Sequence, residues 1–190
     1  MRNDFFYGFI QDFFAGKMGS QQLDVLLANA YIVDGEGEAI EAPDGGLVEL
    51  KELHADDTYS ATGLQYDVYD ATMPGEENKD LALIDYAGIS EGEIAGNEYK
   101  IGIKLYNLNV PAKTLTRVRR PMLHDKFWLG ADNFDFEPAI GDLAGAKADQ
   151  FKHTELEEAE GYTVKVLIER ELTTGTRSQG KMFLVEVISL

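Results

Sequence analysis

The chain has 190 residues, no cysteine and a formal net charge of -17. This length suffices for one substantial domain, or for one domain with an attached arm, and the lack of cysteine excludes disulfides, thiolate metal sites and thiol nucleophiles. A sequence this acidic argues against general DNA or RNA binding and against docking on anionic lipid, because both need an excess of Lys and Arg.

The acidic surplus lies entirely in the first half of the chain. Residues 1–99 carry 21 acidic and 4 basic side chains, whereas residues 100–190 carry 13 of each. We therefore expect two surfaces with different electrostatic roles. No window approaches a membrane span, and Gly8, Gln11 and Asp12 interrupt the first apolar stretch, so we expect an intracellular protein at synthesis.

Residues 4–14 show the apolar spacing of a short amphipathic helix. Two sets of side chains recur every four residues and share a helical face, namely Phe5, Phe9 and Phe13, and then Phe6, Ile10 and Phe14. A second helix is predicted from Ser20 to Tyr31, although residues 30–33 could instead open a strand. We therefore predict an N-terminal arm over residues 1–33 with one or two short helices.

Residues 34–46 consist largely of Gly, Glu, Asp and Pro, which predicts an acidic, Gly-rich linker between the arm and a body of residues 47–190. Acids at alternate positions from Asp34 resemble a calcium loop. The twelfth position is Gly45, however, where such a loop needs a bidentate Glu. We interpret the segment as a solvated acidic loop.

The body changes to the period-two alternation of β-strands. Strands are predicted within 64–69, 81–86, 99–105, 164–168 and 182–188, and the last is apolar on both faces, as in a central strand. A long hairpin loop is predicted over residues 173–180. The pattern indicates a mainly β chain, with an antiparallel β-barrel or β-sandwich body and a short helical N-terminal arm.

No residue spacing points to catalysis, a metal or a cofactor. The three histidines, His54, His124 and His153, share no ligand spacing, and each is interpreted as a lone surface histidine. No nucleophile elbow, phosphate loop or dinucleotide-binding loop occurs. Trp128, the single tryptophan, offers little for carbohydrate binding. We therefore predict a non-enzymatic chain with no catalytic residues, metal ligands or cofactors.

A basic strand is the first candidate for partner binding, formed by Arg117, Arg119 and Arg120 with Lys113 just upstream. Guanidinium groups bind carboxylates in a bidentate manner and tolerate burial at interfaces. This arginine stripe could therefore engage acidic groups on a partner or on a neighbouring copy of the chain. The alternative is that its arginines balance acids within the same fold.

The aromatic N-terminal segment is the second candidate, with Phe5, Phe6, Phe9, Phe13 and Phe14 as its members. Aromatic side chains supply large contact areas at low entropy cost, so the segment could insert into an apolar groove of a partner. The alternative is that it folds onto the core of its own body. Membrane insertion is disfavoured, because Arg2 and Lys17 are the only cations nearby.

Residues 97–190 resemble the decoration, or cement, proteins and other head-module structural proteins of tailed bacteriophages. The resemblance rests on the order of features: a strand over Tyr99–Tyr106, Pro111-Ala112, a basic strand over Thr116–Arg120, then Asp125–Leu129, Asp132–Phe134, Ala139–Asp142 and two closing strands joined by the 175–180 loop. It implies a virion protein, made in the host cytoplasm, that binds and stabilises an assembled capsid lattice. Its implied partners are the major capsid protein and neighbouring copies of itself in a homo-oligomer or symmetric cluster, without nucleic acid or membrane.

Three other functions remain open at this stage. A tail or head–tail connector protein belongs to the same structural class. An acidic-cleft hydrolase acting on glycans would need clustered carboxylates in a deep pocket. An acidic decoy of DNA would need the acids of residues 34–98 to line one elongated face.

Overall fold

The computed structural model describes residues 13–18, 26–54, 68–77, 79–86, 109–174 and 177–190, and they are mainly β. The strands are β1 Phe13–Lys17, β2 Leu27–Ile32, β3 Ala42–Pro43, β4 Leu47–Leu53, β5 Val68–Thr72, β6 Leu81–Asp85, β7 Asn109–Val110, β8 Thr116–Arg119, β9 Lys126–Gly130, β10 Leu143–Gly145, β11 Thr154–Leu156, β12 Thr163–Thr174 and β13 Arg177–Ser189, with a 3-10 turn, η6, at Ala131–Asn133. The predicted mainly β class is confirmed, with several sheets. No helix in these residues is long and apolar enough to cross a membrane.

One sheet has six strands in the order β1-β9-β13-β12-β10-β11, and every neighbouring pair is antiparallel. Strand β13 lies between β9 and β12, so the prediction of a central strand over 182–188 is confirmed. Its residues Phe183, Val185 and Val187 are fully buried on one face. The period-two pattern therefore determines which face of this sheet joins the core.

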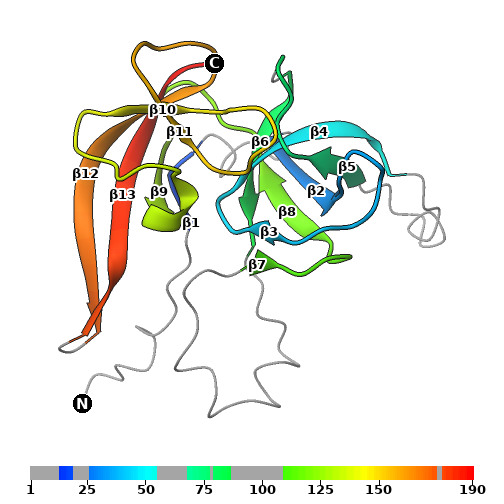
Figure 1. The fold of residues 1–190 in the computed structure, drawn as a ribbon, viewed down its shortest axis with the longest axis horizontal. Coiled ribbons are helices and arrows are strands. Elements are labelled where there is room, and N and C mark those ends of the chain that lie inside the picture. Colours follow the sequence, from blue (N-terminus) through cyan, green and yellow to red (C-terminus); the bar gives the residue numbers. More distant parts are fainter. Residues whose placement is uncertain (1–12, 19–25, 55–67, 78, 87–108, 175–176) are drawn as a thin grey trace.

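A second sheet closes into a small barrel in the order β2-β5-β4-β6-β8, because β8 pairs with both β6 and β2. The expectation of antiparallel pairing throughout is wrong at one position, since β2 and β5 run parallel. Strands β3 and β7 form a separate two-stranded sheet beside the barrel. Figure 1 shows the barrel strands on one side of the molecule and β12, β13, β9 and β1 on the other.

Strands β4 and β6 belong to the barrel, and their outward-facing side chains pack against the six-stranded sheet. In β6, Leu83 packs into a cluster with Phe127, while its neighbour Ile84 packs into the barrel interior. In β4, Leu47 packs into the cluster with Phe127 and Val48 packs into the barrel interior. All of these side chains are fully buried. Burial on both faces explains why residues 81–84 are continuously apolar instead of alternating with polar residues.

The predicted N-terminal helices are not supported where the structure describes the segment. Residues 1–12 and 19–25 lie outside the described residues, but Phe13–Lys17 is strand β1 and Leu27–Ile32 is strand β2. Strand β2 alternates in burial and has β5 and β8 as neighbours, so tertiary pairing overrides its helical spacing. The open alternative of a strand at 30–33 is therefore correct, although the strand begins earlier. Residues 34–46 connect β2 to β4 within one barrel.

The predicted long hairpin loop over 173–180 is also wrong. Strands β12 and β13 remain paired to Thr174 and Arg177, so all but residues 175–176 of the Thr- and Ser-rich segment belong to strands. Threonine favours strands, which offsets the turn-like composition of this segment. The predicted strand over 99–105, and residues 64–67, lie outside the described residues.

Candidate functional site

The arginine stripe lies on β8, where antiparallel pairing aligns it with β6. Asp85 of β6 is the cross-strand partner of Arg117, and its carboxylate accepts hydrogen bonds from the Nε atoms of both Arg117 and Arg119. Arg119 and Asp85 are buried, whereas the Arg117 side chain is 42% exposed. Asp85 and the two arginines form a structural ion-pair cluster. Removal of the Asp85 carboxylate would leave the buried guanidinium charge of Arg119 without this partner, which destabilises a fold.

Arg120 makes the most complete ion pair of the stripe. Its Nε and Nη2 atoms donate to the two carboxylate oxygens of Asp80, at 2.8 and 2.9 Å. Its guanidinium also lies 5.4 Å from the ring centre of Tyr69. The hydrogen bond to Asp80 raises the pKa of Arg120, against the opposing effect of its partial burial. The geometry is the bidentate one expected for arginine and carboxylate.

The alternative interpretation of the stripe is therefore confirmed for its three arginines, which balance acids of the acidic half of the same chain. Lys113 is exposed in the turn between β7 and β8, where it has a positive φ of 65°. The structure does not bring Lys113 to these ion pairs. Engagement of an outside partner by the stripe stays a prediction.

The aromatic segment is described only at its end. Phe5, Phe6 and Phe9 lie outside the described residues. Phe13 and Phe14 belong to β1, where they are the backbone partners of Leu129 and Trp128 in β9. This pairing places the end of the segment at the edge of the six-stranded sheet, in a strand instead of the predicted helix.

A cleft of about 730 Å³ opens where the barrel meets the β10–β11 end of the six-stranded sheet. The barrel side contributes Arg120 and Asp80 together with Glu76, Glu77 and Lys79, and the sheet side contributes Glu160 and Tyr162. Lys79 pairs with Glu77, so two of the four carboxylates already have basic partners. The apolar part of the lining comes from Leu26, Leu81, Pro121, Ala146, Leu156 and Leu190. The cleft can hold a small polar or cationic group.

Behind the cleft wall, His153 is fully buried, which corrects its interpretation as a surface histidine. Its Nδ1 lies 3.3 Å from the carbonyl oxygen of Asn133, and its Nε2 lies 3.1 Å from the hydroxyl of Tyr162. A carbonyl can only accept, so Nδ1 carries the proton and Nε2 accepts from the tyrosine. Burial lowers the pKa of His153 to about 4, although the bond to Asn133 opposes the shift. Burial also raises the pKa of Tyr162.

The other two histidines are closer to the prediction. His124 is largely exposed and its Nδ1 lies 3.2 Å from Glu186. His54 is partly buried, with Nδ1 at 2.6 Å from Asp70. Across the residues that the structure describes, no three His, Asp or Glu side chains are grouped so that they could hold a metal ion.

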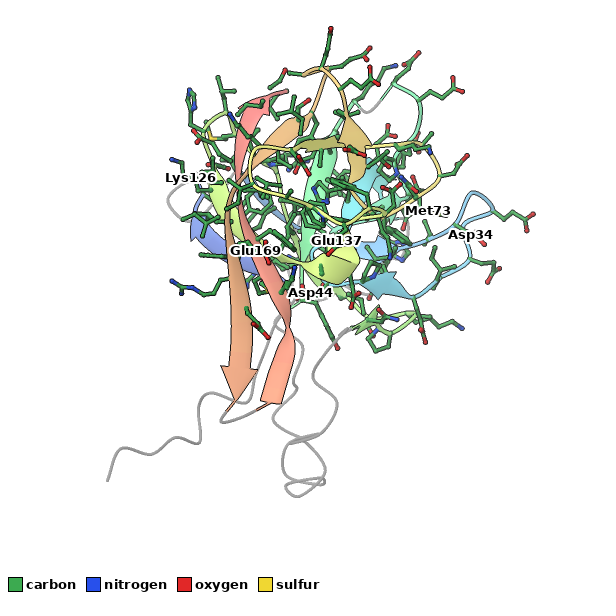
Figure 2. All side chains as sticks on the ribbon, turned by 60° about the vertical axis from the view of Figure 1, so that its left-hand side comes forward. Asp34, Asp44, Met73, Lys126, Glu137 and Glu169 are labelled. Atoms are coloured by element: carbon green, nitrogen blue, oxygen red, sulfur yellow. The ribbon has the colours of Figure 1, made fainter. Side chains whose placement is uncertain are left out.

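The most prominent feature outside the cleft is the hairpin of β12 and β13. Figures 1 and 2 show its far end extending beyond the other strands, and Figure 2 shows Glu169 on it. The Nζ of Lys181 in β13 lies 2.8 Å from Glu169 of β12 and 3.9 Å from Glu137, which follows η6. Arg170 lies over the ring of Trp128, with 5.4 Å between the guanidinium and the ring centre. Sequence reasoning treated part of this hairpin as a loop and so missed it as a surface.

Comparisons of the chain with protein-family models, with curated proteins and with solved structures found no match.

Proposed function

We propose that this chain is a non-enzymatic structural protein of a virion, which binds and stabilises an assembled capsid lattice as a decoration or cement subunit. The observation that carries the proposal is the hairpin of β12 and β13, a projection whose base is anchored in a buried core. A projection of this kind extends the contact surface of the protein beyond its own body. In this proposal the barrel and the sheet packed on it act as one sandwich-like body.

The ion pairs of the body support a structural role. Asp85 and Asp80 bind the three arginines of the stripe, so these groups contribute to the fold. Acids on the barrel loops, such as Glu36 and Glu38, are exposed and keep like-charged particles apart when many copies cover one shell. A protein that binds the assembled shell better than free subunits stabilises that shell by mass action.

The test is sedimentation of the purified chain with undecorated capsid shells, counting copies bound at saturation. We expect saturation at a fixed multiple of the number of capsomers. The control is the same titration with unassembled capsid subunits, to which a cement protein binds less. Absence of binding to shells, or equal binding to shells and subunits, would contradict the proposal. Saturation at a few copies per particle would instead indicate a tail or connector position.

A hydrolase acting on glycans is the second candidate, and one observation favours it. Four carboxylates line the cleft between the barrel and the sheet, and Glu76 and Glu160 are the two to which no basic side chain of the described residues pairs. Glycoside hydrolysis uses two carboxyl groups on opposite sides of the scissile bond. Turnover of glycans by the purified chain, lost in both Glu76→Gln and Glu160→Gln, would establish this activity over the structural role.

A further inference from the structure

One face of the six-stranded sheet carries a row of apolar side chains that belongs to neither core cluster of the described residues. Trp128 of β9 is the strand partner of Leu184 in β13, and Leu184 is the partner of Ile168 in β12. Residues paired in this way point to the same face of a sheet. Ile168 is 45% exposed, and Trp128 and Leu184 are half-buried. This row, which we call the tryptophan face, lies opposite the face that buries Phe127 and Phe183.

The N-terminal segment joins the same sheet beside the tryptophan face. Phe14 of β1 is the backbone partner of Trp128, and Phe13 is the partner of Leu129. Because β1 is antiparallel to β9, the chain before Phe13 leaves β1 at the Gly130 end of β9, towards the far part of the β12–β13 hairpin. Residues 1–12 lie outside the described residues, but the structure determines where they are attached to the sheet.

The segment is long enough to cross the tryptophan face. The three strand spacings from β1 through β9 and β13 to β12 amount to about 14 Å. The eight residues from Phe5 to Phe13 span about 26 Å as a strand and about 12 Å as a helix. An extended segment therefore reaches past β12, and a helical segment reaches β13.

The other segments outside the described residues are attached elsewhere. Residues 55–67 join the barrel strands β4 and β5, and residues 87–108 join β6 of the barrel to β7 beside it. Residues 19–25 follow β1 at its opposite end and lead to β2 of the barrel. Residues 1–12 are therefore the segment that is attached at the edge of this face and on the side of its open hairpin.

The side chains of the segment match the face in polarity and charge. Arg170 lies over the ring of Trp128, so a cation accompanies the apolar row. The segment carries the acids Asp4 and Asp12 against one cation, Arg2. Aromatic side chains pack favourably against one another, and direct attachment gives the segment a local concentration in the millimolar range. Its apolar members are Phe5, Phe6, Tyr7, Phe9 and Ile10.

We propose that residues 1–12 fold back onto the tryptophan face of their own chain, so that aromatic side chains of the segment cover Trp128. The occupant of the face is thus the N-terminal segment, and the two apolar surfaces shield each other from water in the free protein. A partner that binds the aromatic segment has to displace it from Trp128 first. This inference goes beyond shell binding and concerns the free protein.

The chain has one tryptophan and no cysteine, which allows a direct test. A single cysteine introduced by Gly8→Cys is labelled with bimane, whose fluorescence a tryptophan ring quenches on contact. We expect the labelled full chain to be about half as bright as the same labelled chain that also carries Trp128→Phe, because docking holds the label against the ring. The matched control is Gly35→Cys, an exposed glycine with open space around it, next to Asp34 on the side of the molecule away from Lys126 of β9 (Figure 2). There, Trp128→Phe should leave the brightness unchanged.

A second measurement uses Trp128 itself. Phe5→Ser with Phe9→Ser should restore the brightness of the label at position 8 and increase the quenching of Trp128 by acrylamide in the unlabelled chain. Leu53→Ser, at an exposed leucine of the barrel, should change neither value. Denaturant unfolding checks that each variant is folded, and the acrylamide measurement carries the test if Trp128→Phe fails to fold.

Three results would overturn the inference. The first is equal brightness of the label at position 8 with and without Trp128. The second is quenching that disappears on dilution, because the face would then be covered by a second copy of the chain. The third is acrylamide quenching of Trp128 that the two serine substitutions leave unchanged. Because no shell is present, each of these results leaves the shell-binding experiment unaffected.

Discussion

The buried histidine predicts a specific loss of stability in mild acid. The pKa of His153 is about 4 in the folded chain, against 6.5 for an unperturbed histidine. Between these two values the unfolded chain binds one more proton than the folded chain, so protonation favours unfolding. The contribution of His153 to stability is complete above pH 6.5 and is lost as the pH falls towards about 4.

The size of this effect follows from the same two values. Each pKa unit corresponds to about 1.4 kcal/mol, so the full loss is about 3 kcal/mol. About 2 kcal/mol of it falls between about pH 7.5 and about pH 5, where most unperturbed carboxylates remain ionised. That interval is the best one for measurement, because the 34 acids of the chain contribute least there.

The assay is denaturant unfolding of the wild type and of His153→Gln at both pH values. The amide of glutamine preserves a donor and an acceptor for Asn133 and Tyr162 but does not titrate. We expect the wild type to lose about 2 kcal/mol more than the variant on acidification. The imidazole of His153 should also remain neutral at about pH 5 by NMR. Equal losses in the two proteins, or a charged imidazole in the folded state, would refute the reasoning.

Two further predictions concern packing and the ion-pair cluster. A Cβ atom at Gly145 would lie 2.7 Å from the backbone oxygen of Tyr162, so Gly145→Ala should lower the unfolding midpoint, whereas Gly35→Ala, which has open space around it, should leave the midpoint unchanged in the same thermal scan. Asp85→Asn removes the carboxylate beside buried Arg119 and should cost about 3 kcal/mol of unfolding free energy, whereas the exposed Glu77→Gln should cost less than about 1 kcal/mol. A small effect of Asp85→Asn in denaturant titration would show that Arg119 is held by other groups.

The sequence was most informative where burial is regular. Residues 81–86 are predicted as a strand because a continuous apolar run suits a strand that is covered on both faces, and β6 is buried along its whole length. Residues 182–188 are predicted as a strand for the same reason, although β13 buries one face fully and leaves Leu184 and Ile188 half-buried on the other. It was least informative in β2, where Ala28, Ala30 and Ile32 alternate into the barrel. Alanine is a weak marker of a strand, and the leucines around it fit a helical stripe equally well.

The candidate site was also only partly predictable from the sequence. The arginine stripe is visible in the sequence, but its partners are not, because Asp80 lies 40 residues from Arg120 and Asp85 lies 32 and 34 residues from the two arginines that it binds. Pairing over that distance depends on the register of β6 against β8. The burial of His153 also has no local signal, since the side chains of Lys152 and Glu155 close to it in the sequence are charged and exposed. The rings of Phe134, directly after η6, and Tyr162, directly before β12, pack against the imidazole and make its surroundings apolar.

Both faces of strand β6 are buried, so the barrel and the six-stranded sheet depend on the same strand for their cores. Leu83 belongs to the interior of one sheet system and Ile84 to the interior of the other, one residue apart. A fragment that contained only the barrel would expose Leu83 to water. A fragment that contained only the six-stranded sheet would expose the side chains that pack against Leu83. The residues that the structure describes therefore offer no boundary at which the two halves could be separated, and we expect both halves to melt in one step.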